Sequence, residues 1–330
     1  MLQQLKNINY HDLPVSDYSR NYILRMLPHI DYYIDIYRHS LQQMLQQTGK
    51  EPSNITLVDY GGGHGFLSLT AKEMGIGTVI YIDINPQAAA TVTELSKIVG
   101  TSPDHILQGD SESLRQWCAE NRITPNALLG MDVIEHIYRL EDFFADIYSI
   151  NPDITMLFTT GSTPYNPWVV RRLHHIMLSD ERGHSGQKGF LQLRKEHILQ
   201  HYPDMSDSEA DLWAANTRGL TYPDILTAID THTPFKEIDA YNTCDPATGS
   251  WTERILPISD YKSLVRPYHA TIRVTPGYYN TYRKGLKGIV SRLFNLLLHI
   301  PIARPLAPFI FLNIETNDRN KDGVCNKIIM

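Results

Sequence analysis

The spacing of apolar residues divides the chain into a helical start, an alternating middle and a less regular end. Between residues 16 and 47, apolar side chains recur every three or four positions, which predicts a helix, and Pro28 predicts a break within it. From residue 54 the pattern changes to short apolar runs separated by helical segments. This alternation is typical of a parallel sheet covered by helices. The expected strands are 55–60, 78–83, 105–110, 126–134 and 154–161.

The regular alternation ends at Gly161. Residues 162–230 have the pattern of an insertion of helices and loops, and two strand-like runs, 235–243 and 269–279, are expected to complete the sheet. The remainder is a basic and apolar tail. The predicted organisation is therefore an N-terminal helical lid, an α/β domain interrupted by the insertion, and the tail. These parts cover residues 1–50, 51–281 with the insertion at 162–230, and 282–330.

Acidic residues recur at or near the ends of the first four expected strands. The carboxyl ends of parallel strands meet at one edge of a doubly wound sheet, where such folds bind ligands. We therefore expect these carboxylates to border a ligand site. They are Asp59, Asp83, Asp110 and Asp132.

Composition narrows the class of protein. With 42% hydrophobic and 20% charged residues the chain is expected to fold, and a net charge of −6 gives no overall reason to bind nucleic acid. Its three cysteines form no disulfide or zinc pattern, which favours a reducing compartment. The first residues lack the pattern of a secretory signal, so we expect a cytoplasmic protein.

The glycine-rich segment after the first strand is the most informative part of the sequence. Asp59 lies near the end of the strand, and Gly61, Gly63 and Gly65 alternate before the next helix. Glycines allow a tight turn and a close approach of a ligand to the backbone. The dinucleotide-binding fingerprint would require a glycine where Phe66 stands.

The next strand adds a second signal, because Asp83 follows Gly65 by eighteen positions and can accept hydrogen bonds from two ribose hydroxyls. Together with Asp110 and the run DVIEHI at 132–137, this arrangement resembles class I S-adenosylmethionine-dependent methyltransferases, specifically the ubiquinone-biosynthesis O-methyltransferase type, over residues 50–165. The resemblance implies a Rossmann-like sheet of seven strands and S-adenosylmethionine as the cofactor. It implies cofactor contacts for Asp59, Gly61, Gly63, Gly65, Asp83, Ile84, Asp110, Ser111 and Asp132.

Three interpretations of Glu135 and His136 stay open. His136 could act as a general base for a hydroxyl nucleophile, a role that histidine side chains often fill. The acid-x-x-Glu-His spacing also resembles the divalent-metal motif of related O-methyltransferases, although Asp132 stands where those have Glu. In this interpretation Glu135, His136 and a histidine of the insertion hold the ion. In the third interpretation the pair only orients the loop and the cofactor.

The insertion supplies further candidates for the acceptor site. His184 lies in a Gly-His loop that resembles a substrate-side position of the family, whereas a solvated basic loop is the alternative. Tyr165 and Trp168 could stack on a ring or a sugar, although aromatic side chains more often belong to the core.

The expected function is methyl transfer to an oxygen of a small-molecule, glycan or lipid-linked acceptor, where oxygen follows from the resemblance alone. An RNA 2′-O-methyltransferase is an alternative that the negative charge opposes. A catalytically inactive protein that binds S-adenosylmethionine is another.

The tail contains a basic amphipathic segment at residues 282–300. Such a helix lies in a membrane interface or packs on the protein or on a second subunit. We favour peripheral membrane association, which agrees with a lipid-linked acceptor. The three prolines and Arg304 within residues 294–314 argue against a membrane-spanning helix.

Overall fold

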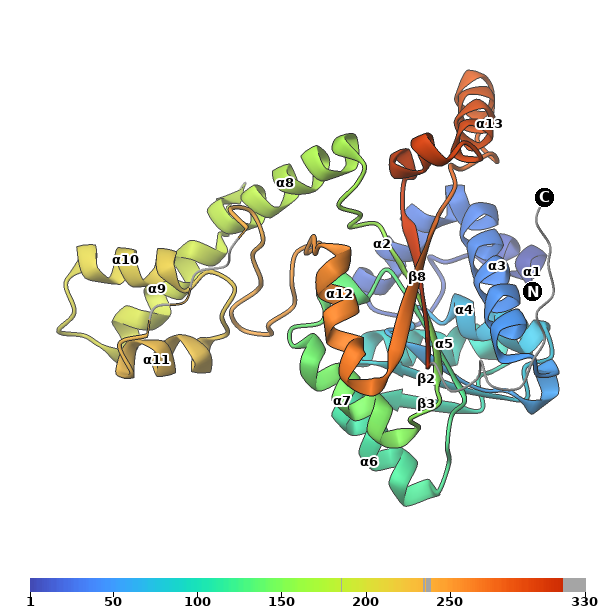
Figure 1. Cartoon of the computed structure of the whole chain (residues 1–330), viewed down its shortest axis with the longest axis horizontal. Coiled ribbons are helices and arrows are strands. Elements are labelled where there is room, and N and C mark those ends of the chain that lie inside the picture. The colour runs from blue at the N-terminus through green and yellow to red at the C-terminus, as the bar shows by residue number, and fades with distance from the viewer. Residues whose placement is uncertain (185, 234, 236–238, 317–330) are drawn as a thin grey trace.

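A mixed sheet of seven strands organises the chain (Figure 1). The computed structural model describes residues 1–184, 186–233, 235 and 239–316. The strands follow the order β3-β2-β1-β4-β5-β9-β8, in which the first five are parallel and β9 is antiparallel to both of its neighbours. Their bounds are β1 Thr56–Tyr60, β2 Thr78–Asp83, β3 His105–Gln108, β4 Ala127–Met131, β5 Thr155–Thr160, β8 Ala270–Pro276 and β9 Ile310–Thr316.

The seven-stranded Rossmann-like sheet and its five parallel strands confirm the sequence prediction, and the run 269–279 supplies β8. The prediction for 235–243 is wrong in the part that the structure describes. Residues 239–243 contain no strand, and Cys244 beyond them forms only an isolated bridge with Trp251. The remaining strand is β9, which comes from the range expected to be a tail.

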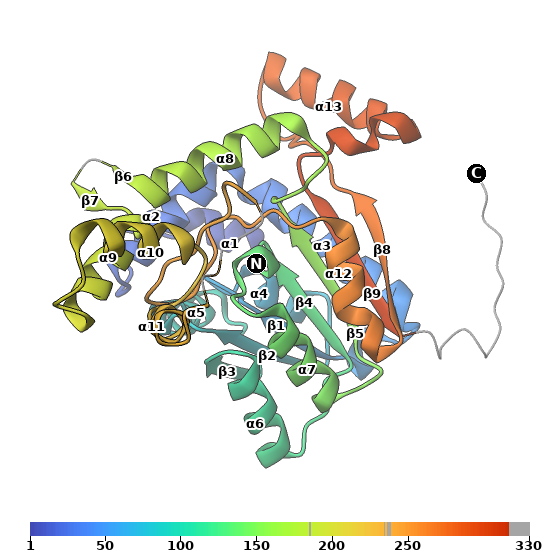
Figure 2. The same ribbon diagram turned by 60° about the vertical axis from the view of Figure 1, so that its left-hand side comes forward.

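Helices cover both faces of the sheet (Figure 2). Apolar side chains of α3, α4 and α5 pack on one face, and those of α6, α7 and α12 pack on the other. The inner strands β1, β2, β4, β5 and β9 are almost fully buried, as their apolar runs require, whereas the edge strands β3 and β8 are partly exposed. The helix bounds are α3 Ile30–Thr48, α4 Phe66–Glu73, α5 Pro86–Val99, α6 Ser111–Asn121, α7 Leu140–Ile150 and α12 Ile258–Val265.

The N-terminal lid consists of α1 (Leu2–Asn7), α2 (Asp17–Met26) and α3, with the single-turn helix η1 (Leu27–His29) between the last two. Pro28 lies in η1, so the predicted break is confirmed. Ser16 caps α2, since its hydroxyl accepts a hydrogen bond from the backbone N–H of Ser19.

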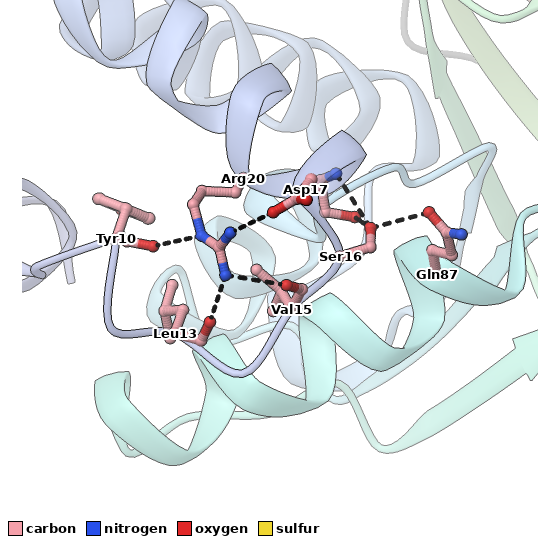
Figure 3. A network of polar contacts seen from close by, with 8 residues as sticks. Tyr10, Leu13, Val15, Ser16, Asp17, Arg20 and Gln87 are labelled. Atoms are coloured by element: carbon pink, nitrogen blue, oxygen red, sulfur yellow. Dashed lines mark hydrogen bonds and ion pairs between the residues drawn. The ribbon is translucent and has the colours of Figure 1, made fainter.

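A cluster of polar contacts holds the loop before α2 in place (Figure 3). The Arg20 guanidinium donates hydrogen bonds to the carbonyl oxygens of Tyr10, Leu13 and Val15 and pairs with Asp17. The Ser16 hydroxyl also donates to the Gln87 side chain on α5 at 2.8 Å. The lid is therefore tied to the helix that follows β2.

The insertion after β5 is helical, as expected. It begins with α8 (Pro167–Arg182) and a short hairpin of β6 (Gly183–His184) and β7 (Gln187–Lys188). Three further helices share a small core of their own around Ile198, Ala214 and Ile225 and stand to one side of the sheet (Figure 1). They are α9 Phe190–His201, α10 Asp207–Asn216 and α11 Tyr222–Asp230.

The connection between β8 and β9 leaves the sheet and returns to it. It contains α13 (Leu286–Leu298) and the 3-10 helix η5 (Pro301–Leu306). None of the helices in the described part of the chain has the length and apolarity needed to cross a membrane. The other 3-10 helices are η2 Pro52–Asn54, η3 Ile134–His136 and η4 Arg266–Tyr268.

Candidate functional site

The glycine loop lies between β1 and α4 at the carboxyl edge of the parallel strands. Gly61, Gly63 and Gly65 all have positive φ angles, of 64°, 52° and 76°. A Cβ atom at Gly61 or Gly65 would come within 2.3 Å of Val133 or 2.0 Å of Val92, so these two glycines allow close packing. A Cβ at Gly63 would meet no atom within 4 Å. Gly63 is therefore where the backbone borders open space that a ligand could occupy.

Asp83, at the end of β2, fixes this loop from the neighbouring strand. Its Oδ2 accepts a hydrogen bond from the backbone N–H of Gly63 at 2.8 Å, and its Oδ1 accepts one from Asn85 at 2.8 Å. An ionised carboxylate offers about four acceptor sites, so both oxygens can accept further bonds. Asp83 thus joins the glycine loop and keeps acceptor capacity at the edge of the sheet.

Asp59 lies behind the loop rather than on its surface. The side chain is buried, and its Oδ2 accepts bonds from the backbone N–H and the hydroxyl of Ser68, at 3.0 and 2.6 Å. Burial raises the pKa of Asp59 to about 7, with a smaller contribution from the negative charge of Asp83. The structure gives Asp59 a positioning contact with α4.

The remaining predicted cofactor residues extend along the same edge. Ile84, directly after Asp83, is an apolar side chain that is 69% exposed. Asp110 caps α6 by accepting bonds from Ser113, and the hydroxyl of Ser111 donates to Asp146 at 2.8 Å. Asp110 and Ser111 therefore serve the start of α6 in this structure, and Ile84 offers an open apolar face.

His64, within the glycine loop, is a residue that the sequence analysis did not single out. Its ring is buried and stacks on Tyr22 of α2, with centroids 4.7 Å apart. Neither ring nitrogen has a hydrogen-bond partner in the described part of the chain. Burial lowers the pKa of His64 to about 4, so the ring is neutral near pH 7. A histidine inside a glycine loop is a signal that sequence reasoning could have used.

Asp132 follows β4 with a φ of 49°, which is rare for a residue with a side chain. Its N–H donates to the carbonyl oxygen of Thr159, and its Oδ1 accepts from the N–H of Gly161 at 3.1 Å. The residue is solvent-exposed, yet the surrounding protein raises the pKa of its carboxyl by desolvation and then through Glu253.

The charge of Asp132 acts on three tyrosines of the N-terminal helices. Burial and, to a smaller extent, the negative charge of Asp132 raise the pKa of Tyr22 to about 12. The same two causes raise the pKa values of Tyr32 and Tyr33. The lid thus presents phenol groups to the edge of the sheet where Asp132 lies.

Glu135 faces the protein interior. Its carboxylate is buried and accepts bonds from the Thr160 hydroxyl at 2.7 Å and from the N–H of Gly161 at 3.2 Å. Burial, followed by the charge of Asp132, raises its pKa well above the usual value. These contacts join η3 to the end of β5, which agrees with an orienting role for Glu135.

His136 is held in one orientation. Its Nδ1 lies 2.7 Å from the carbonyl oxygen of Trp251. Because a carbonyl can only accept, Nδ1 carries the hydrogen, and Nε2 of the neutral ring keeps its lone pair. No described residue forms a hydrogen bond with Nε2, and His136 is among the charges that lower the pKa of Asp132.

The metal-binding alternative does not fit this arrangement. Glu135 points to β5, whereas the Nδ1 of His136 points to Trp251, a segment that sequence reasoning did not connect with the site. The described residues contain no group of three or more His, Cys, Asp or Glu side chains placed to hold a metal ion. The expected set of Glu135, His136 and an insertion histidine is not brought together.

A groove follows one face of α8. Arg172 in this groove is one of the positive charges that lower the pKa of Asp132. His184 lines the groove further along α8. The Nδ1 atom of His184 is 3.2 Å from the hydroxyl of Ser179, which lies about two helical turns beyond Arg172. The groove is lined by Trp168, Arg171, Arg172, His175, Ile176, Ser179, Asp180 and His184.

Comparisons with known proteins give short or distant matches. No family model matches the chain. Ribosomal protein L11 methyltransferase from Bordetella parapertussis is 34% identical over 47 residues, which span 14% of this chain and 15% of that relative.

Two solved structures cover most of the chain. The plantazolicin methyltransferase BpumL in complex with SAH is 10% identical with a TM-score of 0.44, over 96% of this chain and 95% of that chain. A SAM-dependent methyltransferase from Archaeoglobus fulgidus is 12% identical with a TM-score of 0.38, over 84% and 93%. These comparisons do not confirm the ubiquinone-biosynthesis type.

Proposed function

We propose that the chain is an S-adenosylmethionine-dependent methyltransferase that acts on an oxygen of a small-molecule, glycan or lipid-linked acceptor. The observation that carries the proposal is the pairing of Asp83 with the backbone of Gly63, at the one glycine of the alternating set that borders open space. The short match to an L11 methyltransferase adds support for the reaction class.

The residues at this edge fit an adenosine-containing cofactor. Asp83 would accept bonds from the ribose hydroxyls, Ile84 would cover one face of the base, and the backbone of Gly63 would border the amino-acid end. The unpartnered ring nitrogens of His64 are polar atoms that such a ligand could satisfy. When bound, S-adenosylmethionine supplies an electrophilic methyl group on a sulfonium.

His136 would act as the general base for a hydroxyl acceptor. Its Nδ1–H bond to Trp251 fixes the tautomer that leaves Nε2 able to take a proton. Asp132 lies near enough to stabilise the resulting imidazolium, since His136 lowers the Asp132 pKa. Other contributions to rate would come from positioning of the acceptor by the lid and the α8 groove.

The groove indicates the chemistry of the acceptor. Arg171, Arg172, His175 and His184 line it. Asp180, the one acidic side chain among the described residues of its lining, accepts a hydrogen bond from Thr252 at 2.9 Å. Guanidinium groups recognise phosphates and carboxylates. An acceptor with an anionic group, such as a lipid-linked phosphate, therefore suits this groove.

Two assays with the full chain test the proposal. Calorimetric titration with S-adenosylhomocysteine measures cofactor binding, and methyl-labelled cofactor is incubated with lipid, small-molecule and RNA fractions of cell extract. Label in the lipid or small-molecule fraction supports the proposal. Label only in RNA favours the RNA alternative, and binding without transfer to any fraction favours an inactive binding protein.

The variant His136→Asn tests the role of the base, because asparagine can still donate to the carbonyl oxygen of Trp251 but has no Nε2. We expect kcat to fall about 10²- to 10⁴-fold with unchanged affinity for S-adenosylhomocysteine. His269→Asn is a matched control, since His269 is exposed, has a φ of 55° that asparagine tolerates, and lies at the start of β8. Full activity of His136→Asn would show that His136 is not the general base.

A further inference from the structure

Helix α13 exposes an apolar stripe to solvent. Seven apolar side chains of α13 and the residues just after it are between 40% and 75% exposed, and they recur at steps of three and one residues along the chain. At 3.6 residues per turn they form one stripe about 120° wide. They are Leu286, Ile289, Val290, Leu293, Leu296, Leu297 and Ile300.

The helix packs on the protein through its opposite side. Gly288, Ser291 and Leu298 are buried, and a Cβ at Gly288 would come within 2.0 Å of the Arg283 carbonyl oxygen. Asn295 fixes the rotation of the helix, because its side chain accepts from the N–H of Tyr279 at 2.7 Å and donates to the Tyr279 carbonyl oxygen at 3.0 Å.

This orientation is the reverse of an ordinary surface helix, which buries its apolar stripe. Polar contacts and small residues hold α13 with the stripe outward, where water solvates a large apolar area. An exposed apolar patch of this kind marks a surface that binds another apolar phase.

Positive charges border the stripe. Lys287 and Arg292 lie on its two edges, Arg283 and Lys284 precede it, and all four are exposed. No acidic residue occurs between Asp260 and Glu315, although the whole chain has a net charge of −6. Basic residues beside an apolar stripe match anionic lipid headgroups above acyl chains.

We propose that α13 docks the protein on membranes that contain anionic lipids, with the apolar stripe and Ile302, which is 88% exposed, in the interface. The helix would lie in the membrane surface, with Lys287 and Arg292 at the level of the headgroups. The proposal rests on this surface alone and stands apart from the proposed methyl transfer.

The docked helix would lie beside the start of the α8 groove. The Asn166 side chain, which caps α8, donates to the carbonyl oxygens of Leu306 and Ala307 at 2.8 and 3.1 Å, so α8 begins against the end of η5. Figures 1 and 2 both place α8 and α13 at the same end of the molecule. If the methyltransferase proposal holds, a lipid-linked acceptor could reach the groove from the membrane.

Co-sedimentation of the full chain with lipid vesicles tests the docking. Vesicles of phosphatidylcholine with about 30% phosphatidylglycerol are compared with pure phosphatidylcholine, at low and at physiological salt. We expect binding to the anionic vesicles that weakens with salt. Protein that stays in the supernatant with both kinds of vesicle would overturn the proposal.

Two variants assign the binding to α13. Leu293→Gln combined with Leu296→Gln should weaken vesicle binding by about tenfold or more. The control Leu212→Gln, at a leucine of α10 that is 61% exposed, should leave vesicle binding unchanged. Lys287→Glu should weaken it roughly 20-fold, and the control Lys50→Glu should not. Equal binding by the double variant and the wild type would overturn the assignment.

Two further measurements make the result unambiguous. Unchanged S-adenosylhomocysteine affinity and thermal melting of the double variant would show that the loss of binding comes from the surface. Sedimentation velocity without lipid tests a second copy of the chain as the occupant. A wild-type dimer that the double variant dissociates would overturn the membrane proposal.

Discussion

Replacing Asp83 by asparagine tests the cofactor site most directly, because the substitution keeps the shape of the side chain and removes its charge. In the structure each oxygen of Asp83 accepts one backbone N–H, from Gly63 and from Asn85, both at 2.8 Å. The asparagine amide keeps one acceptor oxygen and places an NH₂ group against the other N–H. The variant therefore loses one loop contact and the charged acceptor for a ribose hydroxyl.

The expected magnitude follows from hydrogen bonds to charged groups, which contribute about 1.5–3 kcal/mol each. We expect the stability of Asp83→Asn to fall by about 2 kcal/mol. We expect its affinity for S-adenosylhomocysteine to fall by about 1–3 kcal/mol, which is roughly 5- to 150-fold in Kd.

Calorimetric titration measures the affinity, and urea denaturation measures the stability. Asp104→Asn is a matched control, since Asp104 accepts the N–H of Val79 at 2.7 Å at the opposite end of β2. This control should lose stability and keep the cofactor affinity. A folded Asp83→Asn variant that binds S-adenosylhomocysteine as tightly as the wild type would refute the assignment of this edge to the cofactor.

Two further predictions concern the lid and the glycine loop. Arg20→Met should lower stability by about 2 kcal/mol and speed proteolysis within residues 1–16, because three carbonyl oxygens lose their donor. Limited proteolysis checks this against the control Arg25→Met, since the Nε of Arg25 donates to the Asn21 carbonyl oxygen of its own helix. The folded-state pKa of His64, about 4, lies below the ordinary value of 6.5, so between these pH values only the unfolded state gains the proton and stability falls as the pH falls. His64→Phe should remove about 3 kcal/mol of this acid destabilisation while keeping the contact with Tyr22, and equal pH slopes of the two proteins in urea denaturation would contradict the assignment.

The site divides into residues that the sequence could place and residues that it could not. The glycine spacing and the carboxylates after consecutive strands are local signals, so Gly63, Asp83 and Asp132 were expected at the edge where they lie. The hydrogen bond from His136 to Trp251 joins positions 115 residues apart in the chain. No local pattern predicts such a contact, and it alone selects the tautomer.

The local periodicity of the sequence by itself determined the parallel half of the sheet, the break at Pro28, the helical insertion and the amphipathic character of residues 286–298. These features depend on neighbouring residues, and propensity and spacing act over that range. The tertiary structure decided that Ile310–Thr316, and not the described residues 239–243, provides a strand of the sheet. It did so because β5 and β8 leave a position between them that an apolar segment can fill by pairing with both. It also decided which side of α13 faces outward, since the bonds of Asn295 to Tyr279 fix a rotation that an apolar pattern cannot specify.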